Sequence, residues 1–156
     1  MANVVVMRGV SGSGKSTFIQ RLRERLAKTH TFTVVSMDHY FMQGDTYVFD
    51  SAKLSQAAAF CYKQFLLALA GAGANEIVIV DNTNTTAVEI SPYVLAAAAF
   101  DAPYCIQTLP VPEDLGRNVH GVPVANVLAQ AEKFNQPLPR FWQGDQGLWD
   151  LLNGAN

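Results

Sequence analysis

The sequence predicts an α/β fold in which a parallel sheet of about four to five strands carries helices on both faces. Two observations lead to this prediction. Short apolar runs alternate along the chain with segments whose apolar residues recur at helical spacing. The chain has 156 residues, which is enough for one domain with a sizeable core. No internal repeat or low-complexity linker divides it, so we expect a single domain over residues 1–156.

The first half of the chain predicts two strand–helix pairs. Residues 4–8 form a short apolar run of the kind that is buried in parallel sheets, and a helix over residues 16–28 is expected after it. The second pair is a strand over residues 31–36 and a helix over residues 51–70. A polar loop over residues 43–50 joins this strand to its helix.

The strand expected at residues 76–81 is the clearest in the chain, with four apolar β-branched residues. Two helix starts compete after it. Thr86 with Glu89 fits a capping box, whereas Ser91 before Pro92 fits a cap followed by proline in the first turn. We expect a short turn and then a helix over residues 92–100. A further strand is expected at residues 104–109.

Glycine and proline punctuate the next segment, residues 110–123, which we interpret as a mobile lid. Pro112 is expected to open a short helix that ends at residue 115. A longer helix is expected from residue 123 to about residue 134. For the tail, residues 137–156, we expect irregular structure with one final turn.

One stretch fits the phosphate-loop pattern G-x-x-x-x-G-K-[ST] at every fixed position. Glycines let successive backbone N–H groups point at phosphate oxygens, and the following helix directs its positive dipole end at the anion. Lys15 can reach the β- and γ-phosphates, and the Ser16 hydroxyl can bind Mg²⁺. The predicted nucleotide-binding residues are Gly9, Ser11, Gly12, Ser13, Gly14, Lys15, Ser16 and Thr17.

Two aspartates are expected at the same edge of the sheet as this loop, because ligands of such sheets bind beyond the carboxyl ends of the strands. Asp38 follows the second strand and is the candidate base that accepts the proton of an alcohol; the alternative is an aspartate that caps a turn. Asp81 ends the clearest strand, as an acid that holds Mg²⁺ does. ATP and Mg²⁺ are therefore the expected cofactors.

Arg117 lies in the expected lid, where an arginine can neutralise the charge that develops on a transferred phosphoryl group. Arg140 is the alternative. His120 is interpreted as a structural residue of the lid loop, with a proton carrier as the other reading. Asn82 and Asn84 can either cap the turn after the strand or bind substrate. The candidate substrate-binding residues are Tyr40, Tyr47, Asn82 and Asn84.

Composition sets further expectations. The net charge is −2, but the positive residues concentrate in residues 1–28, so a polyanion footprint and a solvated helix face are both open. Neither a leader segment nor a membrane span is recognisable, so we expect a cytoplasmic protein. Cys61 and Cys105 lie in apolar surroundings and are expected to be reduced thiols, without a disulfide-linked partner. The histidines lack zinc-ligand spacing.

Several segments together resemble the polynucleotide-kinase-like P-loop kinases, in particular the branch that includes the kinase-like domain of NEDD4-binding protein 2. The resemblance covers roughly residues 4–134 in order. It rests on the phosphate loop with Arg8 before it and on the segments MDHYF at 37–41, YVFD at 47–50, VDNTNT at 80–85, PY at 92–93 and RNVHGVP at 117–123.

This resemblance implies a P-loop kinase fold and an ATP-dependent transfer of phosphate to a hydroxyl on a nucleic acid. It implies that Asp38 activates the acceptor hydroxyl, that Arg117 is the lid arginine, and that Lys15 and Ser16 serve ATP and Mg²⁺. Phe41 departs from the basic residue that true polynucleotide kinases tend to carry at this place. This departure is compatible with an acceptor other than a strand end.

The family also contains small bacteriophage enzymes that phosphorylate 5-hydroxymethyluracil within DNA, and this acceptor is the leading specific expectation, with the host cytoplasm as the location. A 5′-hydroxyl end of a polynucleotide is the next. The remaining alternatives are a kinase of a small metabolite or nucleoside, and a nucleotide-binding switch or adaptor. The sequence leaves open whether Asp81 or Asn82 serves the metal.

Overall fold

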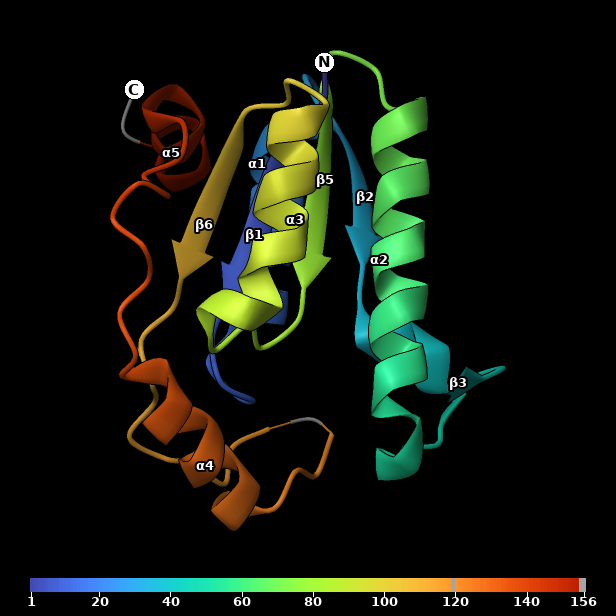
Figure 1. Cartoon of the computed structure of the whole chain (residues 1–156), viewed down its shortest axis with the longest axis vertical. Helices are drawn as coiled ribbons and strands as arrows, with labels where there is room; N and C mark the ends of the chain where they lie inside the picture. Colours follow the sequence, from blue (N-terminus) through green and yellow to red (C-terminus); the bar gives the residue numbers. More distant parts are fainter. Residues whose placement is uncertain (119, 155–156) are drawn as a thin grey trace.

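The computed structural model describes residues 1–118 and 120–154 and contains a four-stranded parallel sheet (Figure 1). Its strands are β1 (Asn3–Arg8), β2 (Thr31–Val35), β5 (Glu76–Asp81) and β6 (Tyr104–Thr108). Their order across the sheet is β2-β5-β1-β6, so β5 lies between the first two strands of the chain. The predicted α/β fold with a parallel sheet is confirmed.

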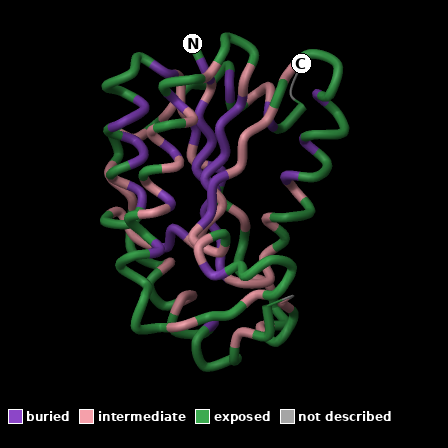
Figure 2. The backbone as a smooth tube through the Cα atoms, turned by 90° about the vertical axis from the view of Figure 1, so that its right-hand side faces the viewer, coloured by how far each residue is buried: buried purple, intermediate pink, exposed green. Residues whose placement is uncertain are grey.

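Helices cover both faces of this sheet, and the alternation of side chains along the strands explains why. On one face, Val4 and Val6 of β1 pack in a core with α2 (Leu54–Gly71) and α3 (Ala87–Ala99). On the other, Val5 and Met7 pack with α1 (Lys15–Leu26) and α5 (Gln146–Asn153). Both faces are therefore apolar, and the strands form the buried centre of the molecule (Figure 2).

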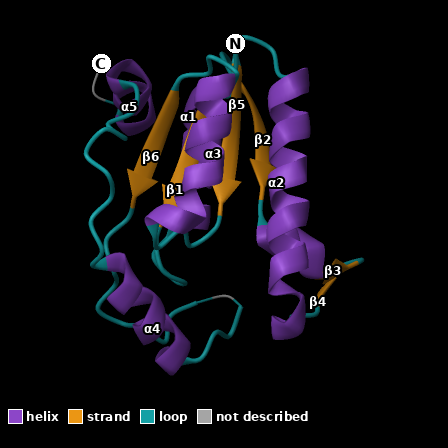
Figure 3. Cartoon of the chain, in the orientation of Figure 1, coloured by secondary structure: helices purple, strands orange, loops and turns teal. Residues whose placement is uncertain are grey.

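All four strands end at the same edge of the sheet, where loops and short elements gather (Figure 3). The phosphate loop joins β1 to α1 there. After β2 come a 3₁₀ turn, η1 (Met37–Phe41), a small hairpin of β3 (Met42–Gln43) and β4 (Thr46–Tyr47), and a second 3₁₀ turn, η2 (Ser51–Lys53). After β6 the chain passes through the predicted lid into α4 (Val124–Phe134).

The start of α3 corrects a prediction. The helix begins at Ala87 and not at Pro92, because both hydrogen bonds of the Thr86–Glu89 capping box form. Pro92 lies inside the helix and cannot donate to the carbonyl of Val88. Val88 is 83% exposed, so water can satisfy that carbonyl.

Two further expectations were wrong. Residues 112–115 form no helix and contain only a bend and the start of a turn. The tail is more regular than expected, because residues 146–153 form α5. The Asp145 side chain accepts from the N–H of Leu148 at the start of α5, and Gly154 ends it with φ +70°. Its buried Leu148 and Leu152 cover part of one sheet face.

Arg8 connects the sheet to α4. Its backbone carbonyl accepts from the N–H of Leu109, where the chain leaves β6. Its buried guanidinium lies over the ring of Phe134 and donates to the carbonyls of Thr85 and Phe134, both at 3.0 Å. Burial lowers the pKa of Arg8, and the nearby Glu89 opposes this shift. The C-terminal end of α4 is thus fixed to the end of β1.

Among the described helices, none is long and apolar enough to cross a membrane.

Replacing Thr86 with alanine tests the observed helix start. We expect Thr86→Ala to lower the free energy of unfolding by about 1 kcal/mol, because the side chain that caps α3 is lost. Ser91→Ala is the matched control, since Ser91 lies inside the helix and its loss should cost less than about 0.5 kcal/mol. Urea unfolding measures both. A larger cost at Ser91 than at Thr86 would contradict this helix start.

Candidate active site

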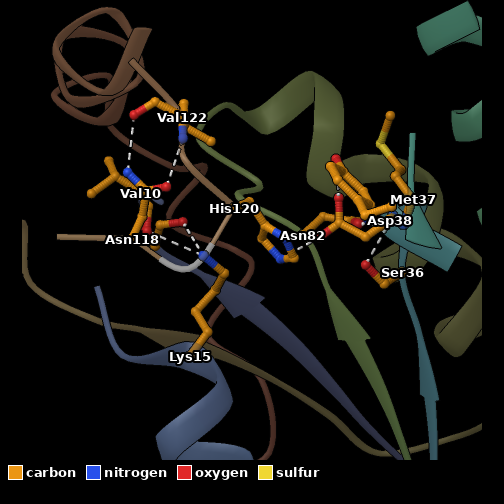
Figure 4. A network of polar contacts seen from close by, with 11 residues as sticks. Val10, Lys15, Ser36, Met37, Asp38, Asn82, Asn118, His120 and Val122 are labelled. Carbon is orange, nitrogen blue, oxygen red and sulfur yellow. Dashed lines mark hydrogen bonds and ion pairs between the residues drawn. The ribbon is translucent and has the colours of Figure 1, made fainter. Parts of the chain in front are cut away.

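The phosphate loop has the backbone that its glycines predict. Gly12 and Gly14 have φ of +81° and +94°, and α1 begins directly afterwards at Lys15. The Lys15 ammonium donates to the carbonyls of Gly9 and Val10 at 2.9 and 3.1 Å (Figure 4). Burial lowers the pKa of Lys15, while the negative charges of Asp81 and then Asp38 raise it. The Lys15 ammonium is therefore held within the phosphate loop and in the field of both aspartates.

Two of the loop glycines pack closely against neighbouring atoms. A Cβ on Gly9 would lie 2.4 Å from the Ser13 hydroxyl oxygen. A Cβ on Gly12 would lie 1.9 Å from the backbone carbonyl oxygen of Arg117. The predicted lid therefore lies directly against the phosphate loop, and no side chain fits between them at Gly12.

Asp38 is positioned by η1 at the end of β2. The Ser36 hydroxyl caps this turn by accepting from the backbone N–H of Asp38 at 3.1 Å. One carboxylate oxygen, Oδ1, accepts from the Tyr47 hydroxyl at 3.0 Å, and Oδ2 lies 3.4 Å from Nε2 of His120. Burial, followed by the charge of Asp38, raises the pKa of Tyr47 to about 12, so this phenol remains a hydrogen-bond donor.

Asp81 lies beside the phosphate loop because β5 pairs with β1 in a register that sets Asp81 opposite Met7. Burial raises the pKa of its carboxyl, and the positive charge of Lys15 opposes the shift most strongly. Within the described residues, no hydrogen bond to this carboxylate is formed. Asp81 lines the same cavity as Ser16, and a carboxylate with a hydroxyl is an oxygen donor set that fits Mg²⁺.

Such a site would take its remaining ligands from the nucleotide and water rather than from further side chains. In the part of the chain that the structure describes, no three His, Cys, Asp or Glu side chains gather into a metal cluster. Cys61 and Cys105 are both buried free thiols.

Asn82 has a role that the sequence did not reveal. Its amide oxygen accepts from the backbone N–H of Met37 at 2.8 Å (Figure 4). Its amide nitrogen lies 3.5 Å from the Cys61 sulfur. Tyr93 donates to the same sulfur at 3.3 Å. Asn82 thus joins the end of β5 to the first residue of η1, and this contact sets where Asp38 stands relative to the phosphate loop.

These groups line one cavity of about 970 Å³ at the edge of the sheet. Of the predicted residues, Asp38, Tyr47, Asp81, Asn82 and Arg117 line it, together with residues 11–17 of the phosphate loop. The structure therefore brings the candidate base, the predicted metal residues and the lid arginine to one place.

Four predicted or alternative residues lie outside this cavity. Gly9 contributes its carbonyl, which accepts from Lys15, and packs closely against Ser13. Tyr40 packs edge-to-face against Phe41 instead of contacting the cavity. Asn84 is 2% exposed and donates to the Met7 carbonyl at 2.7 Å, so it holds the turn after β5 and is not free to bind substrate. Arg140, the alternative to Arg117, is exposed elsewhere.

Sequence reasoning missed most of the apolar wall of the cavity. Phe41, Phe49 and Leu54 line the side next to Asp38. Phe41 is 4% exposed and packs against Tyr47 and Phe49, with ring centroids 6.1 and 5.1 Å away. The aromatic residues of the loop over 43–50 were the only signal for this wall.

The lid and α4 supply the opposite side. Asn118 accepts from the N–H of Val122 at 2.7 Å and donates to the carbonyl of the same residue at 3.0 Å, which closes the lid loop on itself (Figure 4). Gln130 of α4 accepts from the backbone N–H of Ser11 at 2.9 Å. Helical spacing alone gave no reason to single out Gln130.

A family described as an AAA domain (AAA_33) matches residues 4–120, which is most of the chain. The chain belongs to this family. Human NEDD4-binding protein 2 is 29% identical over 139 residues. That match covers 85% of this chain but only 8% of the human protein, so the chain corresponds to a small part of that relative.

Solved structures with the same fold include P-loop kinases. A gluconokinase from Sinorhizobium meliloti 1021 aligns with a TM-score of 0.59 at 15% identity, over 98% of this chain and 89% of that one. The Mycobacterium tuberculosis APS kinase CysC in complex with AMPPNP and APS gives 0.59 at 17% identity, over 97% and 98%. The Pnkp1/Rnl/Hen1 complex gives 0.59 at 21% identity, over 89% and 45%. The fold is that of P-loop kinases.

Replacing Gly12 tests the contact between the phosphate loop and the lid. We expect Gly12→Ala to weaken ATP binding by about tenfold, because the new methyl group displaces the Arg117 carbonyl. Gly44→Ala is the matched control: it has φ +60°, so the backbone strain is similar, but a Cβ there meets nothing within 4 Å. Titration calorimetry with ATP measures both. If Gly12→Ala binds ATP as tightly as Gly44→Ala does, the lid does not rest on Gly12.

Proposed function

We propose that the protein is an ATP- and Mg²⁺-dependent kinase that transfers the γ-phosphoryl group to an alcohol. One observation carries the proposal: Asp38 lines the same cavity as the phosphate loop, Lys15 and Asp81. A hydroxyl group that enters this cavity can therefore reach both a carboxylate and a bound triphosphate. A P-loop protein that only binds nucleotide does not require the carboxylate.

The chain's own groups have separate tasks in this reaction. The N–H groups of the phosphate loop and Lys15 bind the β- and γ-phosphates. Asp38 accepts the proton as the acceptor O–H bond breaks and the new O–P bond forms, while the bond to the leaving ADP breaks. Arg117 neutralises charge on the transferred group. Ser16 and Asp81 would hold Mg²⁺, which supplies further charge neutralisation.

For the acceptor, we propose a hydroxyl on a nucleic acid, with the hydroxymethyl group of 5-hydroxymethyluracil in phage DNA as the specific case. The aromatic wall beside Asp38 supports a flat group, because the exposed ring of Phe49 lies beside Phe41 in the lining of the cavity. Lys15 and Arg117 are the basic residues other than His120 among the described lining residues, and both are assigned to the triphosphate. A base within a duplex would have to be flipped out to enter.

A 5′-hydroxyl end of a polynucleotide is the next acceptor to test. Here the described wall beside Asp38 offers no cation for the phosphates of the strand, which favours the base. A small metabolite or nucleoside is the second candidate function. The net charge of −2 favours it, because a chain with few positive groups has less to offer a polyanion.

Asp38→Asn tests the assignment of the base. We expect this variant to bind ATP as the wild type does but to lose at least about a hundredfold in transfer rate, because an amide cannot accept the acceptor's proton. Labelled ATP is offered with three acceptors: DNA that contains 5-hydroxymethyluracil, a 5′-hydroxyl oligonucleotide, and the free nucleoside. Transfer to none of them by the wild type, with ATP binding intact, would contradict the nucleic-acid proposal. Unchanged turnover in the variant would remove Asp38 from the mechanism.

Phe49→Ala tests the acceptor wall. Phe49 is 54% exposed although it is large and apolar, so its ring is accessible for stacking. We expect its loss to raise the KM for a base acceptor by about tenfold and to leave the KM for ATP unchanged, because one stacking contact disappears. Phe141→Ala, at an 80% exposed phenylalanine outside the cavity, is the control.

Salt separates the two acceptor classes in the same assay. If the acceptor is DNA, its KM should rise steeply with salt concentration, whereas a nucleoside acceptor should show a flat dependence.

Equal KM values for Phe49→Ala and the wild type would contradict the role of this wall.

A further inference from the structure

His120 reaches from the lid to the candidate base. Its Nε2 lies 3.4 Å from Oδ2 of Asp38, and Figure 4 shows the imidazole between the lid and η1. The other carboxylate oxygen is held by the Tyr47 hydroxyl at 3.0 Å. The imidazole also packs on the Tyr47 ring, with centroids 4.9 Å apart. Asp38 is thus contacted on one oxygen by the Tyr47 hydroxyl of the hairpin, which donates a hydrogen bond, and on the other by the His120 imidazole.

The loop that presents His120 is shaped by its own contacts. Both hydrogen bonds between Asn118 and Val122 span His120 and close the loop around it. Gly121, the next residue, has φ +63°, which a side chain would disfavour. On the other side, the backbone of Arg117 rests on Gly12 of the phosphate loop. The position of His120 therefore depends on the lid lying over the nucleotide site.

The pair contributes little to the stability of the fold. Both side chains are 45% exposed, and ion pairs at such exposure are typically worth less than about 1 kcal/mol. A contact that stabilises the fold so little, but involves the candidate base and lies inside the candidate site, is better explained by a role in the reaction.

We propose that His120 is a positioning residue that makes Asp38 competent only when the lid is closed. Its Nε2–H donates to Oδ2 and, with Tyr47 on Oδ1, fixes the plane of the carboxylate. Each oxygen keeps a further lone pair, and one of these receives the acceptor's proton. His120 itself takes no proton from the acceptor. The proposal rests on the proposed kinase function.

Three variants and one double variant test it through kinetics. We expect His120→Ala to lower kcat by about tenfold with the KM for ATP unchanged, because proper orientation of the base is lost without loss of nucleotide contacts. His120→Gln should recover most of kcat, since an amide N–H can also donate to Oδ2. His30→Ala is the control, because His30 lies at the start of β2, away from the cavity.

In an Asp38→Asn background, His120→Ala should cause no further loss, since the two residues act as one unit. Full activity of His120→Ala, or an independent loss in the double variant, would overturn the proposal. Loss of activity in both His120→Ala and His120→Gln would overturn it too, because it would assign the proton itself to the imidazole.

A spectroscopic measurement separates this proposal from the proposed function. The chain has three histidines, so their ring ¹⁵N signals can be assigned one by one. Asp38→Asn should shift the His120 signals and leave those of His30 in place, whether or not an acceptor has been found. If the wild type transfers phosphate to no acceptor but the shift occurs, the kinase function fails and the contact stands. If His120 does not respond, the positioning role is wrong.

Discussion

The pairing of β5 with β1 is the constraint on which the site depends. In this register Met7 lies opposite Asp81, so the phosphate loop and the carboxylate leave neighbouring strands side by side. The strand order β2-β5-β1-β6 then puts η1 on the outer side of Asp81 and the lid on the outer side of the phosphate loop. Four segments that are far apart in the sequence meet because all four strands end at one edge.

Short polar contacts turn this arrangement into a defined geometry. Asn82 attaches η1 to the end of β5. The Ser36 hydroxyl caps η1 by accepting a hydrogen bond from the backbone N–H of Asp38. Tyr47 then joins the hairpin to the carboxylate. Each contact crosses from one loop to another, so the loops position one another while the sheet supplies a rigid base. This arrangement is typical of sites whose residues lie on loops that a rigid scaffold presents.

Short sequence patterns predicted those features that depend on neighbouring residues alone. The apolar runs of β1 and β5 and the glycine pattern of the phosphate loop each carry their own signal, and from them the edge shared by Lys15, Asp38 and Asp81 followed. The start of α3 was mistaken because two valid caps competed, and only the capping box at Thr86 formed. The structural role of Asn84 and the reach of His120 depend on contacts between distant segments. No single stretch of sequence encodes those.

Arg8 anchors both ends of the segment that contains the expected lid. Its carbonyl fixes Leu109, where the chain departs from β6, and its guanidinium fixes Phe134, where α4 ends. The segment over residues 110–133 is therefore attached at both ends to a single amino acid, Arg8, which immediately precedes the phosphate loop. A displacement of this segment would leave the sheet and α5 in place, because Arg8 holds both of its ends.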